Sequence, residues 1–361
     1  MRTGSCDLPL HHGKAPKWLF ERMVTLSRAI FEVIERDFGR DEFLKRLSDP
    51  FWFQSLACVL GYDFHSSGTT TVTCGALKEA LTVENHGVVF LGGKGKASKK
   101  TPEEIEKIGE MWNLSSSKIN ALVYASKAAA KVDNSLIQDG YQLYHHSFIM
   151  AEDGKWAVIQ QGMNDASGYA RRYHWLSDEV KEFVVEPHVA ICCDRKEKMV
   201  LNMTAKESEE SRKAAVDLVK EAPEKLRISL KDASQTTLTD YGFTMQREHE
   251  IDLHMYKKLI DLNDFQPKNY EELIMFKGVG PKTIRALALL SELVYGIAPS
   301  WRDPARFSFA HGGKDGFPYP VDREQYDKST EILKSAISEA KIGNEEKLKA
   351  FRRLKECFVH A

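Results

Sequence analysis

Cysteine, net charge and long apolar runs are all scarce in this sequence, and each scarcity excludes a class of protein. Six cysteines in 361 residues are too few for a disulfide framework. The adjacent pair, Cys192 and Cys193, has the wrong spacing for a zinc knuckle or a redox motif. No stretch approaches the roughly 18 apolar residues that cross a bilayer, and the N-terminus lacks the apolar run of a secretion signal. The sequence therefore predicts a soluble, cytoplasmic protein with no membrane partner and with free thiols.

Net charge is nearly absent, because 51 lysines and arginines oppose 52 aspartates and glutamates. Proteins that bind nucleic acid over a broad surface are usually basic overall. The balance excludes a diffuse basic surface and leaves a local one open. Basic clusters without nearby acids are therefore the features that would indicate such binding.

Core-forming residues are abundant, since 42% of the chain is hydrophobic. At roughly 100–200 residues per domain, the length predicts two or three compact units. Apolar residues at helical spacing predict a helix over 18–38, and short apolar or alternating runs predict strands at 87–91, 169–175 and 184–193. We predict an α+β protein in two parts. Residues 1–200 form a mixed N-terminal domain with a small antiparallel sheet, the expected catalytic part, and residues 201–361 form a helical domain.

A β-hairpin is the clearest local prediction. Segments 142–150 and 155–163 flank Asp153-Gly154, a pair typical of a two-residue type I′ turn. That turn would place His146 opposite Gln161 and Ser147 opposite Gln160. Because side chains alternate along a strand, His146 and Gln161 would then share one face of the sheet.

The most specific motif covers residues 269–287 of the helical domain. Asn269 and Glu272 form a capping box for a short helix, and Pro281 opens a second helix after a turn containing Gly278 and Gly280. Backbone amides of the turn and of the second helix would suit a phosphate oxygen. The candidate phosphate-binding residues here are Lys277, Gly278, Gly280, Lys282, Thr283 and Arg285.

These residues resemble the helix-hairpin-helix motif of DNA repair glycosylases, structure-specific nucleases and ligases. The resemblance implies binding to the minor-groove side of DNA without sequence readout, because phosphate contacts position a protein but do not specify a sequence. An ordinary pair of helices joined by a glycine turn would have the same pattern.

Two further glycine-containing segments are candidates for phosphate contact. Residues 92–100 carry four lysines, Lys94 and Lys96 among them, ahead of a helix that Thr101 and Glu104 would cap. Residues 309–322 form a long loop in which His311 and Lys314 could line a DNA edge. For the first segment, a solvated basic loop is an equally good interpretation.

Polar groups in the N-terminal half suggest a catalytic site. A row of histidine, glutamine and arginine on neighbouring strands is unusual for a plain core face, which favours valine and isoleucine. Such groups could hold a scissile phosphate or a divalent ion such as Mg²⁺ or Mn²⁺, although strand histidines are commonly structural. The candidate catalytic residues are Asp63, His65, His145, His146, Gln161 and Arg172.

A second catalytic hypothesis follows from the helix-hairpin-helix resemblance. Base-excision glycosylases with lyase activity place a lysine in the hairpin and an aspartate at a later helix cap. Lys282 occupies the lysine position here, and Asp303 precedes Pro304 at a slightly longer spacing than is common. The alternative is that Lys282 contacts phosphate and Asp303 only caps a helix.

The chain as a whole resembles a prokaryotic domain-of-unknown-function family, seven-sixty-three. The resemblance is carried by residues 7–16, 52–54, 65–68, 92–96, 156–164, 171–175 and 311–316. It implies little about activity, because the family is defined without one.

Function is therefore predicted from the residues themselves. The leading hypothesis is a DNA-processing, repair-type nuclease that acts on the phosphodiester backbone of duplex or damaged DNA. The alternatives are a base-excision glycosylase or lyase that uses Lys282 and Asp303, and a DNA-binding scaffold without catalysis. The sequence does not specify a resident metal, protein partners or an oligomeric state.

Overall fold

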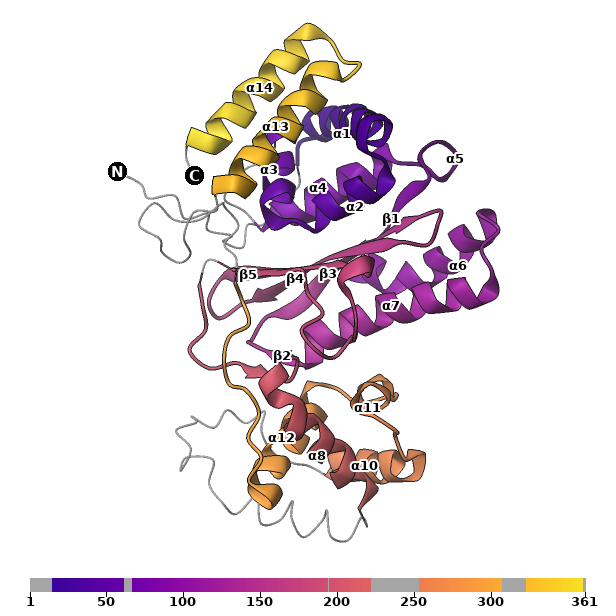
Figure 1. Cartoon of the computed structure of the whole chain (residues 1–361), viewed down its shortest axis with the longest axis vertical. Coiled ribbons are helices and arrows are strands. Elements are labelled where there is room, and N and C mark those ends of the chain that lie inside the picture. The colour runs from indigo at the N-terminus through magenta and orange to yellow at the C-terminus, as the bar shows by residue number, and fades with distance from the viewer. Residues whose placement is uncertain (1–14, 62–66, 194, 222–252, 307–322, 360–361) are drawn as a thin grey trace.

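The protein is a sandwich of a central sheet between two helical layers (Figure 1), which confirms the α+β prediction. The computed structural model describes residues 15–61, 67–193, 195–221, 253–306 and 323–359. Within this part of the chain, no helix is long and apolar enough to cross a membrane.

The sheet has five antiparallel strands in the order β1-β3-β4-β5-β6. Their bounds are Val88–Lys94 for β1, Gln142–Ala151 for β3, Trp156–Asn164 for β4, Tyr169–Leu176 for β5 and Ala190–Cys192 for β6. Of the strand predicted over 184–193, only this last part forms. Two short strands, β2 (Ile137–Gln138) and β7 (Leu201–Asn202), pair separately.

Helices from both ends of the chain cover one face of the sheet. The helices are α1 (Lys17–Phe38), α2 (Arg40–Ser48), α3 (Pro50–Leu60), α4 (Gly68–Ala80), α13 (Arg323–Glu339) and α14 (Asn344–Val359). Their apolar side chains pack with Phe90, Ile149 and Ile159 of the sheet in one core. Leu333 and Ile337 of α13 and Leu354 of α14 belong to that core, so the last two helices pack against α1 and α3.

The other face of the sheet packs on α6 and α7, with the remaining helices beyond them (Figure 1). Phe148, Met150 and Val158 point to this side. After the short helix α5 (Val83–His86), the chain passes through β1, the 3-10 helix η1 (Gly95–Lys100), α6 (Thr101–Met111) and α7 (Ser116–Ser135). The 3-10 helices η2 (Ser177–Glu179) and η3 (Lys206–Ser208) precede α8 (Glu209–Lys220), α10 (Leu253–Phe265), α11 (Tyr270–Met275) and α12 (Pro281–Tyr295).

The β3–β4 hairpin forms where it was predicted, but its register differs by one residue. Ala151 N–H donates to Lys155 O at 2.9 Å, so the loop has three residues rather than two. Gly154 takes the left-handed conformation, φ +86°, that closes a three-residue hairpin loop. His146 therefore pairs with Gln160, not with Gln161, and Gln161 pairs with His145. Directly opposed side chains share a face, so the predicted pairing of His146 with Gln161 on one face is wrong.

The start of α6 was predicted correctly, but its cap was not. Thr101 Oγ1 donates to Ser98 O at 2.8 Å and does not cap the helix. The Glu104 carboxylate reaches back across the layer, where it accepts from Gly92 N and from Lys78 Nζ. The Glu104 carboxylate thus already accepts a hydrogen bond from Gly92 N, a backbone amide of the glycine segment that was predicted to bind phosphate.

Gly92 of β1 has no room for a side chain, and its replacement by alanine should be costly. Its φ is +80°, and an added Cβ would lie 2.3 Å from His146 O and 2.5 Å from Thr101 Oγ1. Strain and overpacking together are expected to lower the free energy of unfolding by about 2–5 kcal/mol. Gly95→Ala is the matched control, because Gly95 also has positive φ, +60°, with open space around it. Urea denaturation measures both variants, and equal losses would contradict the steric argument.

Candidate functional site

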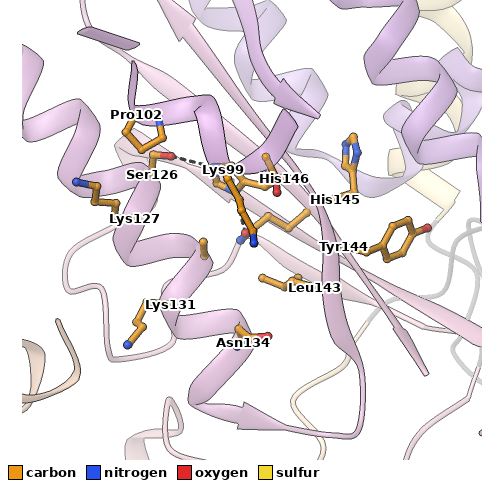
Figure 2. A pocket seen from close by; sticks show the side chains of 13 residues that line it. Lys99, Pro102, Ser126, Lys127, Lys131, Asn134, Leu143, Tyr144, His145 and His146 are labelled. Atoms are coloured by element: carbon orange, nitrogen blue, oxygen red, sulfur yellow. Dashed lines mark hydrogen bonds between the residues drawn. The ribbon is translucent and has the colours of Figure 1, made fainter. Parts of the chain in front are cut away.

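A pocket of about 530 Å³ opens between η1, α7 and the end of β3 (Figure 2). Three lysines line it: Lys99 from η1, and Lys127 and Lys131 from α7. Ser126, His146 and Gln160 also line it. None of its described lining residues is acidic, so the pocket favours an anionic ligand.

The position of α7 places its polar residues along the pocket. Ser115 Oγ accepts from Lys118 N at 3.3 Å and begins the helix. Val123, Ala129 and Val132 face the core, which leaves Lys127, Lys131 and Asn134, spaced at three and four residues, on the other side. Figure 2 shows these three side chains following one another along the helix.

A chain of buried hydrogen bonds extends from the pocket into the core. Ser126 Oγ lies 2.9 Å from His146 Nε2, and His146 Nδ1 lies 2.8 Å from Gln160 Oε1. Gln160 Nε2 in turn donates to the Asp133 carboxylate. Asp133 also accepts from Trp175 Nε1 at 3.1 Å and contacts His188 Nε2. Ser126, His146, Gln160 and Asp133 are all at most 5% exposed.

The Asp133 carboxylate determines the roles of the other groups. Gln160 presents its amide nitrogen to Asp133 and its oxygen to His146, and an amide oxygen only accepts hydrogen bonds. His146 Nδ1 then carries the proton, and His146 Nε2 is left as an acceptor for the Ser126 hydroxyl. Burial lowers the pKa of His146 despite the opposing effects of Gln160 and Asp133. The imidazole is therefore neutral, with its lone pair at Nε2.

The same face of α7 leads from the pocket to the turn between α11 and α12. Lys131 Nζ donates to Val279 O in that turn. Beyond the end of α7, Gln138 Nε2 donates to Pro281 O at 2.8 Å, and Arg285 Nε donates to Gln138 Oε1 at 2.7 Å. Burial and the neighbouring Lys258 lower the pKa of Lys131. Lys131 thus connects the pocket with the turn. We call the lysines of these two places, Lys99, Lys127, Lys131, Lys277 and Lys282, the α7 surface.

The α11–α12 segment has much of the predicted geometry. Asn269 Oδ1 accepts from Glu272 N at 2.8 Å, and the Glu272 carboxylate accepts from Lys268 N at 2.8 Å. Val279 is 3% exposed and packs in the core. Gly278, Lys277 and Lys282 are exposed, and Gly280 is half-buried. Thr283, by contrast, is 2% exposed and Arg285 binds Gln138, so these two are poorly placed for DNA contact. Recognition of DNA by this hairpin stays a prediction.

Of the lysines of the first glycine segment, Lys99 lines the pocket and Lys94 lies beside it. Lys94 ends β1 and its Nζ lies 5.7 Å from the Tyr144 ring centre, over a pocket-lining residue. Lys96 and Lys99 are exposed on η1. The segment is a strand end and a 3-10 turn rather than an open loop.

The sheet separates the predicted catalytic residues. His146 faces α7, whereas His145, Gln161 and Arg172 lie on the face covered by α3 and α4. His145 is among the residues that line the pocket, but in Figure 2 its ring points away from Lys99. His145 Nε2 lies 3.0 Å from Ser147 Oγ, and Gln161 contacts Thr70 of α4. A single site that contains all four side chains is therefore wrong.

Arg172 is held in the core on that second face. Its Nε donates to His174 Nε2 at 3.0 Å, and both terminal nitrogens donate to Gln54 Oε1 at 3.2 Å. Its guanidinium carbon lies 4.6 Å from the Phe53 ring centre. With no exposed surface, Arg172 stabilises the fold rather than contacting substrate.

The two residues of the lyase hypothesis have different surroundings. Asp303 accepts from Arg171 in a bidentate ion pair, at 3.1 and 2.7 Å, and from Glu197 N and Ala305 N. Arg171 is fully buried and also pairs with Asp139 at 2.7 Å. Lys282 is exposed on α12. Asp303 is thus fully engaged by structural partners, which disfavours a role beside a sugar cation.

Four predicted residues, Asp63, His65, His311 and Lys314, lie outside the described residues. Within the described ranges, no three histidine, cysteine, aspartate or glutamate side chains are grouped as metal ligands.

Sequence reasoning missed Ser126, Lys127, Lys131 and Asp133 as site residues and did not select Gln160. Their signal was weak, because serine and aspartate within an alanine-rich helix resemble ordinary helix residues. The useful clue was the spacing of Ser126 and Asp133, which at seven residues share a helix face.

A family model described as "Protein of unknown function (DUF763)" matches residues 4–321. No curated protein and no solved structure matches the chain.

Proposed function

The chain belongs to the DUF763 family, and we propose that it is a DNA-processing protein, a repair-type nuclease that binds the phosphodiester backbone through the α7 surface. One observation carries this proposal. Three lysines line the pocket, and none of its lining residues in the described part of the chain is acidic. One of these lysines, Lys131, also donates to the glycine turn between α11 and α12. Backbone amides and lysines supply charge-assisted hydrogen bonds to phosphate.

The geometry supports two separate contacts with DNA, one at the α11–α12 turn and one in the pocket. The exposed Lys277 and Lys282, beside the α11–α12 turn, would hold one phosphate of the duplex. The pocket, within the usual 300–1,000 Å³ range of ligand sites, would admit a phosphodiester or a nucleotide displaced from the duplex. Neutral net charge is compatible with this arrangement, because the positive groups are concentrated where the ligand would lie.

Charge reversal tests the binding. Lys99→Glu/Lys127→Glu, at the pocket, and Lys277→Glu/Lys282→Glu, at the turn, should each weaken binding of a fluorescently labelled duplex at least about tenfold near 0.1 M salt. Each lost phosphate contact should reduce the slope of log affinity against log salt by about 0.9. Fluorescence anisotropy over a salt series measures both quantities.

The matched control is Lys328→Glu/Lys334→Glu, which makes the same charge change on exposed lysines of α13, in the opposite helical layer. It should bind with a slope close to that of the wild type. If the wild-type protein bound no duplex even at 50 mM salt, the proposal would be wrong.

Cleavage is tested with labelled duplexes that contain normal, abasic or damaged bases, incubated with Mg²⁺, with Mn²⁺ and with EDTA. Cutting of the backbone supports the nuclease. Binding without cutting in every condition would reduce the function to that of a DNA-binding scaffold.

A further inference from the structure

Ser126 and His146 have the arrangement of a nucleophile and its general base. The Ser126 hydroxyl lies 2.9 Å from His146 Nε2, within the 2.6–3.2 Å reach of proton transfer. Both residues line the pocket (Figure 2). The hydroxyl therefore donates toward the base, and both residues lie almost completely buried in the wall of the pocket.

The orientation of the His146 ring is fixed by hydrogen bonds on the side away from Ser126. Gln160 accepts from His146 Nδ1, and Asp133 holds the Gln160 amide in the required direction. Asp133 is itself held by Trp175 Nε1. Activated serine nucleophiles generally have a third group that orients the base. Here Gln160 orients His146, and the Asp133 carboxylate holds Gln160 in place.

We infer that Ser126 is a nucleophile that attacks the phosphorus of a phosphodiester, with His146 as its general base and Gln160 and Asp133 as positioning residues. The substrate class rests on the proposed function. It agrees with the lysines that line the pocket and with the lack of a carboxylate among its described lining residues.

The first step forms a bond between Ser126 Oγ and phosphorus and transfers the hydroxyl proton to His146 Nε2. The bond from phosphorus to the leaving oxygen breaks, and that oxygen takes a proton from a lysine ammonium of the pocket. Water then attacks phosphorus, the Ser126 oxygen leaves with the proton from His146, and a proton of the water restores the lysine. The sum is hydrolysis of the diester to a monoester and an alcohol.

The test uses a labelled duplex in which sulfur replaces the bridging leaving oxygen at one position. Thiolate leaves without protonation, so a covalent protein–DNA adduct should accumulate, and the free thiol can be measured with a thiol reagent. Mass spectrometry of the digested adduct should place the DNA on Ser126. Ser126→Ala and His146→Gln should lower the rate of thiol release by about 10³-fold or more.

Ser135→Ala is the matched control, because Ser135 is an equally buried serine at the end of the same helix. It should react at the wild-type rate. Anisotropy with unmodified duplex checks that Ser126→Ala is folded and still binds DNA.

The outcomes separate the two proposals. An adduct on Ser126 supports the inference. Unchanged thiol release by a folded Ser126→Ala variant overturns it and leaves DNA cleavage intact. A wild-type protein that binds the duplex but forms neither adduct nor product also overturns it. A wild-type protein that binds no DNA overturns the proposed function as well.

Discussion

Replacing Asp303 with alanine is expected to lower the free energy of unfolding by about 3–5 kcal/mol, because it leaves a buried charge only partly compensated. Arg171 is fully buried between Asp303 and Asp139. Asp303 supplies two of its hydrogen bonds and also accepts from the amides of Glu197 and Ala305. Removal of the carboxylate would orphan groups on three segments of chain. Urea denaturation followed by tryptophan fluorescence measures the loss.

Two companion variants make the result specific. Asp303→Asn keeps the shape and one acceptor and should lose less than alanine does. Asp41→Ala removes an exposed partner of Lys155 and should cost no more than about 1 kcal/mol. A catalytic aspartate, as the lyase hypothesis requires, would leave stability nearly unchanged when replaced. An Asp303→Ala variant within about 1 kcal/mol of the wild type would therefore contradict the structural role.

Acid is expected to destabilise the protein already above the pH range in which aspartate and glutamate side chains ordinarily titrate. Three buried histidines are held neutral. Burial, with His146 and Lys94 nearby, lowers the pKa of His145 from 6.5 to about 3. Burial lowers the pKa of His146, opposed by Gln160 and Asp133, and burial with the adjacent Arg172 lowers the pKa of His174 well below its ordinary value.

The sign follows from proton counts. Below pH 6.5 these histidines are protonated in the unfolded chain but not in the folded one, so stability falls as pH falls. Each contributes about 1.4 kcal/mol per pH unit once pH is well below 6.5. His145 and His174, whose pKa values fall furthest, should together remove about 3 kcal/mol between pH 6.5 and pH 5. His146 adds to that loss, and the whole stability of many domains is only about 5–15 kcal/mol.

Urea denaturation at pH 7.5, 6.5 and 5.5 measures this dependence in a range where aspartate and glutamate titrate little. His145→Gln should make the slope shallower by up to about 1.4 kcal/mol per pH unit, since one of the titrating groups is gone. Stability that stayed constant from pH 7.5 to 5.5 would show that these imidazoles are protonated in the folded protein too.

Local signals in the sequence predicted local structure well. The hairpin, the start of α6 and the two helices at residues 270–295 follow from glycine, proline and capping residues that act within a few positions. The errors came from contacts between residues that are distant in the sequence, which local signals do not predict. Glu104 reaches Gly92, twelve residues back, where a carboxylate was not expected.

The candidate site was harder to predict because one residue of register reassigns every side chain on a strand. The loop Glu152-Asp153-Gly154 has three residues, and that difference alone moves Gln160, not Gln161, beside His146. Asp133 could not be connected to Gln160 before the packing of α7 on the sheet was known. The histidines were recognised as unusual, but the face to which each belongs is a property of the folded sheet.

The packing of α13 and α14 on the first helices of the chain affects when the protein can finish folding during translation. Arg353 donates to Val59 O across 294 residues of chain, and Leu354 closes the core of α1 and α3. At about 5–20 residues per second, translation separates these partners by about 15–60 s. During that interval the nascent chain exposes apolar surfaces of α1 and α3, which makes it a natural client for chaperones until α14 emerges.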